Sequence, residues 1–381
     1  MRIFKNQTVY EAAIERINWL FDEFPNVAVA VSGCKDSSVI FELTLQVARE
    51  RNRLPLDVMF TDQEGEWAST IEMIRYMMYH PDVKPFWLQV PIVLFNATST
   101  EQPWLECWNE DAEDLWVHPR DPIAITENVY GTVRFKDLFD KFLAVEYADR
   151  RTAFIGGVRA EESPNRATAL TDQVTYKWAT WGRIVSKKLG HYVFYPLYDW
   201  AYSDVWKAIH ANNWKYSTHY DKLYQYGVHV RDMRVSNLHH ETAVQNLFFL
   251  QEFEPETYAR LTGRLQGIDT AGKLGETNDF FVSSLPFMFS SWREYRDYLL
   301  ENLITNPDWR RRLEKMFEQN DRDLGEETGN EKYRREIQSI LTNDWEGAKM
   351  ANYQANIKNR ALRKRRRKER KEQRDLEVAN V

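Results

Sequence analysis

Cysteine is the residue that this sequence has least of, and its scarcity excludes several kinds of site. The chain of 381 residues contains two cysteines, Cys34 and Cys107. Two thiols cannot build a disulfide framework, a four-cysteine zinc site or an iron–sulfur cluster held by the cysteines of one chain. We therefore expect no iron–sulfur cluster and no disulfide scaffold.

Long apolar runs are also missing. No stretch of about 18 apolar residues occurs, which is the length that a membrane-spanning helix needs, and the N-terminus lacks the apolar core of a signal peptide. A content of 43% hydrophobic and 28% charged residues is instead typical of a globular chain with a sizeable core. The sequence therefore predicts a cytoplasmic protein without membrane contact.

The charge of the chain is divided unevenly. Residues 358–377 contain eleven basic and four acidic residues, a net charge of +7, so that a total charge of −6 leaves −13 on the rest. Such a block is typical of a tail that binds the phosphates of a nucleic acid or an acidic protein partner. The alternative is a solvated, frayed helix that only aids solubility. A homo-oligomer is compatible with the sequence, which leaves the oligomeric state open.

Predicted strands and helices alternate through the first half of the chain. Short apolar runs predict strands at 26–31, 56–61, 86–90, 152–158 and 192–197. Helical periodicity predicts helices at 8–24, 39–51, up to about 80, at 138–150 and from 203 onward. This alternation predicts an α/β fold with a doubly wound, mostly parallel sheet.

The chain divides into three predicted regions. Residues 1–235 form the α/β domain, with an irregular, Trp-rich insertion at about 96–135. Residues 236–350 form a mainly helical C-terminal domain, and residues 351–381 form the basic tail.

Two segments of the first region allow more than one interpretation. The insertion carries Trp104, Trp108 and Trp116, which either stack on a base or form a small aromatic core that holds the loop. The basic run from Lys177 to Lys188 either binds a second phosphate or is the solvated face of a helix, and we expect the helix face.

The strongest functional signal is the sequence SGCKDSS between the first predicted strand and the next helix. Unpaired backbone N–H groups gather at such a turn, and the helix dipole adds positive potential. Gly33 lets the backbone approach an anion closely, and Lys35 adds a positive charge. The loop also offers three hydroxyl donors, on Ser32, Ser37 and Ser38. It therefore predicts a pyrophosphate site, although the alternative is an ordinary strand–turn–helix with a serine cap.

Three segments, in this order along the chain, resemble one superfamily. SGCKDSS resembles the PP-loop of the ATP pyrophosphatase (adenine nucleotide α-hydrolase) superfamily. GGVRAEESPNRA at 156–167 and YPLYDWAYSDVW at 195–206 resemble segments of phosphoadenosine phosphosulfate (PAPS) reductases, which narrows the resemblance to the PAPS reductase-like branch. The segment 235–264 is more loosely similar to an extension in a subgroup that includes the immunoglobulin-binding regulator A proteins.

The resemblance implies that the loop binds ATP or PAPS and that the chain cleaves between the α- and β-phosphates. It assigns the pyrophosphate to Lys35 and the surrounding loop, Cys34 included. Arg159 and Arg166 would clamp a phosphate or sulfate. Asp36 or Asp62 would hold Mg²⁺, so that Lys35, Asp36 and Asp62 are the expected catalytic residues.

Asp62 belongs to an acidic segment that follows the second predicted strand. The side chains of Asp62, Glu64 and Glu66 either bind a metal or the ribose of a nucleotide, or form a solvated acidic loop. Of the three, Asp62 is favoured as a ligand because it lies at the end of the strand.

Both cysteines bear on how the chain departs from its resemblance. Cys34 replaces the second glycine of the PP-loop, where it either narrows the anion pocket or points away; a reactive thiol is a further alternative. PAPS reductases use a catalytic cysteine near the C-terminus, and no cysteine follows Cys107 here.

The sequence therefore predicts a PP-loop enzyme that cleaves or transfers at the α-phosphate and adenylates an acceptor, without sulfonucleotide reductase activity. The alternative is a non-catalytic nucleotide-binding regulator that acts through a protein or nucleic-acid partner.

Overall fold

A computed structural model gives the fold of the chain. It describes residues 6–269 except 97, 100, 103, 172 and, between 231 and 246, all but 233, 235 and 238; it also describes 284–324, 329–341 and isolated positions from 344 to 357. The basic tail predicted at 358–377 lies outside the described residues, so its role stays a prediction.

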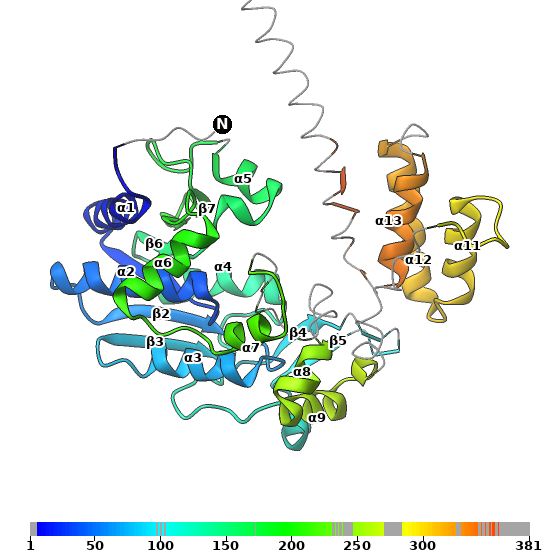
Figure 1. The fold of residues 1–381 in the computed structure, drawn as a ribbon, viewed down its shortest axis with the longest axis horizontal. Coiled ribbons are helices and arrows are strands. Elements are labelled where there is room, and N and C mark those ends of the chain that lie inside the picture. Colours follow the sequence, from blue (N-terminus) through cyan, green and yellow to red (C-terminus); the bar gives the residue numbers. More distant parts are fainter. Residues whose placement is uncertain are drawn as a thin grey trace, which may run out of the picture. The chain divides into compact units, whose positions relative to one another are not determined.

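A six-stranded sheet lies at the centre of the first compact unit, in the order β3-β2-β1-β6-β8-β7 (Figure 1). Its strands are β1 Asn26–Ala30, β2 Leu56–Thr61, β3 Val83–Leu88, β6 Thr152–Ile155, β7 Gly182–Ser186 and β8 His191–Phe194. All neighbouring strands are parallel except β7, which runs antiparallel to β8 at the edge. The strand order reverses between β1 and β6, so the loops after these two strands flank the switch point where α/β sheets commonly bind ligands.

Helices cover both faces of this sheet. One face packs against α1 Val9–Glu23, α2 Lys35–Glu50, α3 Ala68–Met78 and α6 Tyr202–Asn212. The core on the other face contains side chains of α4 Phe135–Glu146, and the same cluster extends to α8 Leu247–Phe253 and α9 Pro255–Arg264. The predicted doubly wound, mostly parallel sheet is therefore confirmed.

Alternating side chains of each buried strand serve the two faces. Val27 and Val29 of β1 belong to the core under α1 and α2, whereas Ala28 belongs to the core under α4. This is the period-two pattern of a strand buried on both sides, and it explains why β1 reads as a continuous apolar run.

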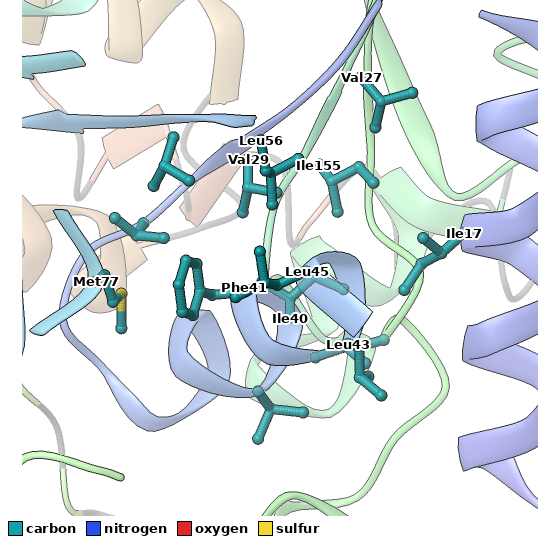
Figure 2. Packing of buried hydrophobic residues seen from close by; sticks show 14 of the residues in the cluster. Ile17, Val27, Val29, Ile40, Phe41, Leu43, Leu45, Leu56, Met77 and Ile155 are labelled. Atoms are coloured by element: carbon teal, nitrogen blue, oxygen red, sulfur yellow. The ribbon is translucent and has the colours of Figure 1, made fainter. Parts of the chain in front are cut away.

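The core between the sheet and α2 fixes where the helix begins. Figure 2 shows Val29, Leu56 and Ile155, from three adjacent strands, gathered near Ile40 and Phe41 of α2. All five side chains are at most 1% exposed, and burying each contributes on the order of 1.5–3 kcal/mol. This packing holds the first turn of α2 directly beyond the end of β1.

Two predicted segments have a different structure from the one expected. The insertion at 96–135 is not wholly irregular, because β5 Trp104–Cys107 pairs antiparallel with β4 Ile92–Phe95 and a 3₁₀ helix, η1, spans Glu110–Leu115. Trp108 and Trp116 are buried, with ring centroids 5.3 Å apart, as expected of an aromatic core that holds the loop.

The basic run from Lys177 to Lys188 was wrongly predicted as a helix face, since it contains the edge strand β7. The β-branched pair Ile184 and Val185 favours a strand. Gly190 has φ of +69°, which suits the tight turn between β7 and β8. The charged side chains therefore lie at an edge of the sheet.

The chain forms two compact units. The first comprises residues 1–96 and 104–273, and the second comprises 97–103 and 274–381. Helices α8 and α9 belong to the first unit, although we expected the C-terminal domain to begin at residue 236. That domain boundary stays a prediction. No helix in the described part of the chain is long and apolar enough to cross a membrane.

The second unit contains three described helices, α11 Trp292–Asn302, α12 Pro307–Leu324 and α13 Gly329–Leu341. A buried ion pair joins two of them: Nη1 of Arg296 lies 2.6 Å from Oε2 of Glu336. Asn320 of α12 donates to the other oxygen of Glu336 at 3.1 Å. Because the carboxylate of Glu336 has these partners, its burial destabilises the fold less than the burial of an unpaired charge would.

Candidate functional site

Residues 31–34 link β1 to α2 through a sharp turn. Gly33 adopts φ of +69°, a left-handed conformation that favours glycine. A Cβ atom built on Gly33 would lie 2.7 Å from Cγ2 of Thr70, so there is no room for a side chain. The turn therefore packs directly against the first turn of α3.

Hydroxyl groups within the loop fix its shape. Ser37 Oγ accepts the N–H of Ser32 at 3.2 Å and donates to the carbonyl of Cys34 at 2.9 Å. Ser38 Oγ donates to the same carbonyl at 2.9 Å. These serines thus hold the loop itself in this structure, and their predicted role as anion donors stays a prediction.

Cys34 is the N-cap residue of α2. Its Sγ accepts the N–H of Ser37 at 3.4 Å and the hydroxyl of Ser32 at 3.2 Å. Sulfur is a weak acceptor, so this cap is weaker than a serine or aspartate cap. The thiol is thus engaged with polar groups of its own loop, where the PP-loop has glycine.

The backbone amides of the turn form the donor pattern of an anion site. Within the described residues, the amides of Gly33, Cys34 and Asp36 donate to no protein acceptor. The amide of Lys35 donates to the hydroxyl of Tyr220 at 3.1 Å. Unpaired amides and the positive end of the helix dipole together attract an anion to this position.

Three predicted site residues meet beside the turn. Lys35 Nζ lies 3.3 Å from Oδ2 of Asp36, and Nε of Arg159 forms a close ion pair with Oδ1 of the same carboxylate. Each residue is no more than 7% exposed. Two buried cations beside the loop amides suit a phosphate, although Glu161, 3.2 Å from Nη1 of Arg159, offsets part of their charge.

Arg159 and Arg166 do not form one clamp in this structure. Nη1 of Arg159 donates to the carbonyl of Trp200 at 3.4 Å and to Glu161 at 3.2 Å. Arg166 pairs with Glu162, and its side chain is 48% exposed. The structure therefore brings Arg159 to the loop, while the role predicted for Arg166 stays a prediction.

Gly157 explains how the loop after β6 reaches α2. A Cβ atom built on Gly157 would lie 2.7 Å from the carbonyl carbon and oxygen of Asp36 and 2.9 Å from the amide nitrogen of Ser37. Only glycine allows this approach of two backbones. The glycine places Arg159, two residues later, beside the carboxylate of Asp36.

Asp62, directly after β2, is fully buried, and both oxygens of its carboxylate have partners. Oδ2 accepts N–H groups of Trp87 and Gln89, each at 2.9 Å. Oδ1 accepts the amide of Glu64 at 2.9 Å and lies 3.3 Å from Nε2 of His118. Burial alone would raise the pKa of Asp62, but the charge of His118 and these hydrogen bonds lower it. The predicted catalytic and metal roles of Asp62 stay predictions.

The next two acidic residues are buried, which corrects the alternative of a solvated acidic loop. Glu64 is 0% exposed, and its Oε1 lies 2.6 Å from Nε of Arg264. Glu66 is 5% exposed, and burial together with the charge of Asp62 raises its pKa to about 8. The loop is buried because partners distant in the sequence cover it, so its composition alone was misleading.

The protein groups present do not fit a resident Mg²⁺ centre at Asp36 and Asp62. Within the described residues, no group of three or more His, Cys, Asp or Glu side chains is arranged to hold a metal ion. Asp36 is engaged by two cations, and Asp62 by three hydrogen-bond donors and by the ion pair with His118. Because Mg²⁺ in nucleotide sites is held largely by the substrate phosphates, the ion stays a prediction.

Two residues beside the loop were missed by the sequence analysis. Tyr220, in α7 His219–Gln225, accepts the amide of Lys35. Glu254 accepts the amides of Ala68 and Ser69 at the start of α3. Each lies 185 or 186 residues from its partner, so no local pattern could indicate the contact.

Comparison with known families places the chain. Residues 26–227, more than half of the sequence, match the phosphoadenosine phosphosulfate reductase domain. The chain therefore belongs to the PAPS reductase domain family. Residues 227–370 match a domain of unknown function, DUF3440.

Individual relatives are distant. An uncharacterized protein of Escherichia coli (strain K12), YbdN, is 29% identical over 310 residues, 77% of this chain and 75% of that protein. An adenosine 5′-phosphosulfate reductase of Lysinibacillus sphaericus (strain C3-41) is 25% identical over 223 residues, 58% of this chain and 79% of that protein. The PAPS reductase structure from Candida auris has a TM-score of 0.33 and 18% identity, and covers 60% of this chain and 89% of that one. The predicted PAPS reductase-like branch is confirmed, and the regulator subgroup stays a prediction.

Proposed function

We propose that the chain is an adenine-nucleotide enzyme that binds ATP or PAPS at the loop after β1. The observation that carries the proposal is the meeting of unpaired loop amides with Lys35 and Arg159 at the switch point of the sheet. Membership of the PAPS reductase domain family supports a nucleotide as the anion.

Each of these groups has a role in the proposed complex. The amides of Gly33 and Cys34 and the start of α2 bind the β-phosphate side of the nucleotide. Lys35 and Arg159 neutralise part of its charge. Asp36 holds both cations in place before the nucleotide enters.

The reaction we propose is adenylyl transfer. An oxygen of the acceptor attacks the α-phosphorus of ATP, and the bond from that phosphorus to the oxygen bridging the β-phosphate breaks. Pyrophosphate leaves with the bonding electrons, and the acceptor loses its proton to solvent. The chain contributes by positioning the two reactants and by stabilising charge on the leaving pyrophosphate.

We do not propose sulfonucleotide reduction, because neither cysteine is placed as its nucleophile. Cys107 is 1% exposed and donates to the carbonyl of Gln63 at 3.3 Å. Burial and the charges of Glu64 and Asp62 raise the pKa of this thiol well above its ordinary value. Cys34 is engaged as the cap of α2. We therefore assign the thiolate attack on sulfur to neither residue.

The basic segment 358–377 supports a nucleic-acid or protein acceptor in this proposal, because its charge of +7 attracts phosphates or acidic side chains. Removing residues 358–377 should abolish acceptor binding and leave nucleotide binding unchanged. Filter binding at two salt concentrations, with single-stranded and duplex nucleic acids, measures the first effect.

The experiment that tests the function is a product assay with Mg²⁺ as counter-ion. With ATP it measures pyrophosphate and AMP, either free or attached to the acceptor. With PAPS it measures sulfate and adenosine 3′,5′-bisphosphate, either free or attached to the acceptor. Asp36→Ala should abolish product formation, because it releases Lys35 and Arg159. Asp140→Ala is the matched control, since Asp140 lies on the exposed surface of α4 and pairs with Arg183.

The outcomes separate the two candidate functions. Product from the wild type, lost in Asp36→Ala and retained in Asp140→Ala, supports the enzyme. Nucleotide binding by calorimetry without any product, also with candidate acceptors added, overturns the enzyme and favours the non-catalytic regulator. Absence of both binding and product contradicts a nucleotide site.

A further inference from the structure

The segment that begins the domain of unknown function contacts the nucleotide domain through two charged side chains. The PAPS reductase match ends at residue 227, and the second match begins there. Both Glu254 and Arg264 lie beyond this point. Arg264 nevertheless binds Glu64 in the loop between β2 and α3, and Glu254 binds the first turn of α3. The first turn of α3 borders residues 31–34 between β1 and α2, which we call the phosphate loop.

Glu254 caps α3 from a distance. The N-cap residue of α3, Trp67, provides no side-chain hydrogen bond to the helix. Instead, the carboxylate of Glu254 accepts the amide of Ala68 at 2.7 Å and that of Ser69 at 3.1 Å. The residue is 9% exposed. A carboxylate at this position satisfies two orphan amides and complements the helix dipole.

Arg264 holds the loop that precedes this turn. Its Nε and Nη2 atoms donate to the two oxygens of Glu64 at 2.6 and 3.2 Å, and Nη2 also donates to the carbonyl of Glu106 at 2.7 Å. The two side chains of the pair are 8% and 0% exposed. A buried pair of this kind fixes the geometry of the groups it joins.

The turn that Glu254 caps lies against the phosphate loop. Thr70, next to Ser69 in the first turn of α3, is the residue that leaves no space for a side chain at Gly33. The hydroxyls of Ser69 and Thr70 are buried and, within the described residues, have no hydrogen-bond partner. This turn therefore retains hydrogen-bonding capacity beside the proposed nucleotide.

We propose that Glu254 and Arg264 are positioning residues of the nucleotide site. They hold the β2–α3 loop and the first turn of α3 against the phosphate loop, so that Gly33 and its neighbours keep the shape that binds the anion. The first described helices of the domain of unknown function, α8 and α9, thereby help to hold the nucleotide site in shape. The effect on affinity rests on the proposed function, whereas the effect on loop order does not.

The test uses the full chain with Glu254→Gln, which keeps the size of the side chain and removes its charge. Glu256→Gln is the matched control, because Glu256 is exposed in the first turn of α9. Hydrogen exchange of the ligand-free protein should accelerate about tenfold at residues 68–70 and also at 33–37, as expected for a lost helix cap. The dissociation constant for ATP or PAPS should rise by a similar factor, on the order of tenfold.

Each result decides the proposal. Faster exchange at 68–70 alone, with 33–37 unchanged, overturns it, because the cap would then be local to α3. Unchanged exchange at both segments also overturns it. A wild type that binds neither nucleotide contradicts the proposed function, while exchange at 33–37 still tests the positioning role. Should Glu254→Gln fail to fold, Arg264→Lys replaces it in the test. This variant keeps the charge and loses the paired geometry, and it should also show faster exchange at both 68–70 and 33–37.

Discussion

The hydroxyl of Tyr220 accepts the backbone N–H of Lys35 at 3.1 Å, in the first turn of α2. The ammonium group of the same lysine lies 5.2 Å from the centroid of the Tyr220 ring. Tyr220 is 2% exposed, so both contacts are shielded from water. One side chain of α7 thus holds the main chain and the charge of the lysine at the phosphate loop.

Replacing Tyr220 with Phe should destabilise the nucleotide-free protein, because the buried N–H of Lys35 would lose its acceptor. The free energy of unfolding should fall by about 1–3 kcal/mol. A bound nucleotide that accepts this N–H should recover part of the loss. Urea unfolding with and without ATP measures both effects. Tyr216→Phe is the control, because it removes an exposed hydrogen bond to Asp221. It should change neither the free energy of unfolding nor the stabilisation that ATP gives.

Replacing Gly157 with Ala should displace the loop after β6 from α2. The new methyl group would lie 2.7 Å from backbone atoms of Asp36, and relieving such overpacking costs about 1–3 kcal/mol. Nucleotide affinity should fall as Arg159 moves. Gly263→Ala is the control, because no atom lies within 4 Å of a Cβ there; alanine in α9 should be neutral or stabilising. Equal stability of the two variants would contradict the close approach.

Replacing Arg159 with Met should leave the carboxylate of Asp36 with one cation fewer in a buried setting. Removing one partner of a buried pair destabilises by about 3–5 kcal/mol, and nucleotide binding should be lost with it. Arg166→Met should change stability by less than about 0.5 kcal/mol, because that side chain is half exposed. Thermal unfolding and calorimetry of both variants test whether the two arginines differ in this way.

Glu66 should make stability depend on pH. Its pKa in the folded chain is raised to about 8 from an ordinary 4.5 by burial and by the charge of Asp62. Between these values the folded state binds more protons than the unfolded state, so the free energy of unfolding falls as pH rises and levels off above about 8.

Glu66→Gln should flatten this part of the profile and raise stability near pH 8. A residual slope should remain. Burial opposes charging of His118, but the nearby Asp62 raises its pKa, so its stabilising charge is lost as pH rises further. Urea unfolding between pH 5 and 9 tests this, with Glu72→Gln, an exposed position in α3, as the control. A wild-type profile that rises over this range would argue against a protonated Glu66.

The strand–turn–helix around Gly33 could be predicted because its signals are local. The apolar run before it is long enough for a strand buried on both faces, and the glycine and serines that follow suit a tight turn. Arg159 could also be placed, since it follows a predicted strand and the ends of parallel strands meet at one edge of the sheet.

The contacts around Glu64 could not be predicted because they depend on tertiary partners. From the sequence alone, an acidic run is expected to lie in solvent. The partner that allows Glu64 to be buried is Arg264, which lies 200 residues away. The cap on α3 was missed for the same reason: Glu254 is remote in sequence, and Trp67 carries no capping signal. The edge strand was missed because its charged residues outweighed the pair Ile184 and Val185.

The basic residues at β7 have a consequence for how the sheet meets other copies of the chain. An edge strand exposes main-chain groups that can pair with a neighbouring molecule. Arg183 within β7, and Lys187 and Lys188 just after it, are exposed. Like charges on two such edges repel each other, so these side chains oppose edge-to-edge association. They favour a sheet that contains the strands of one chain only.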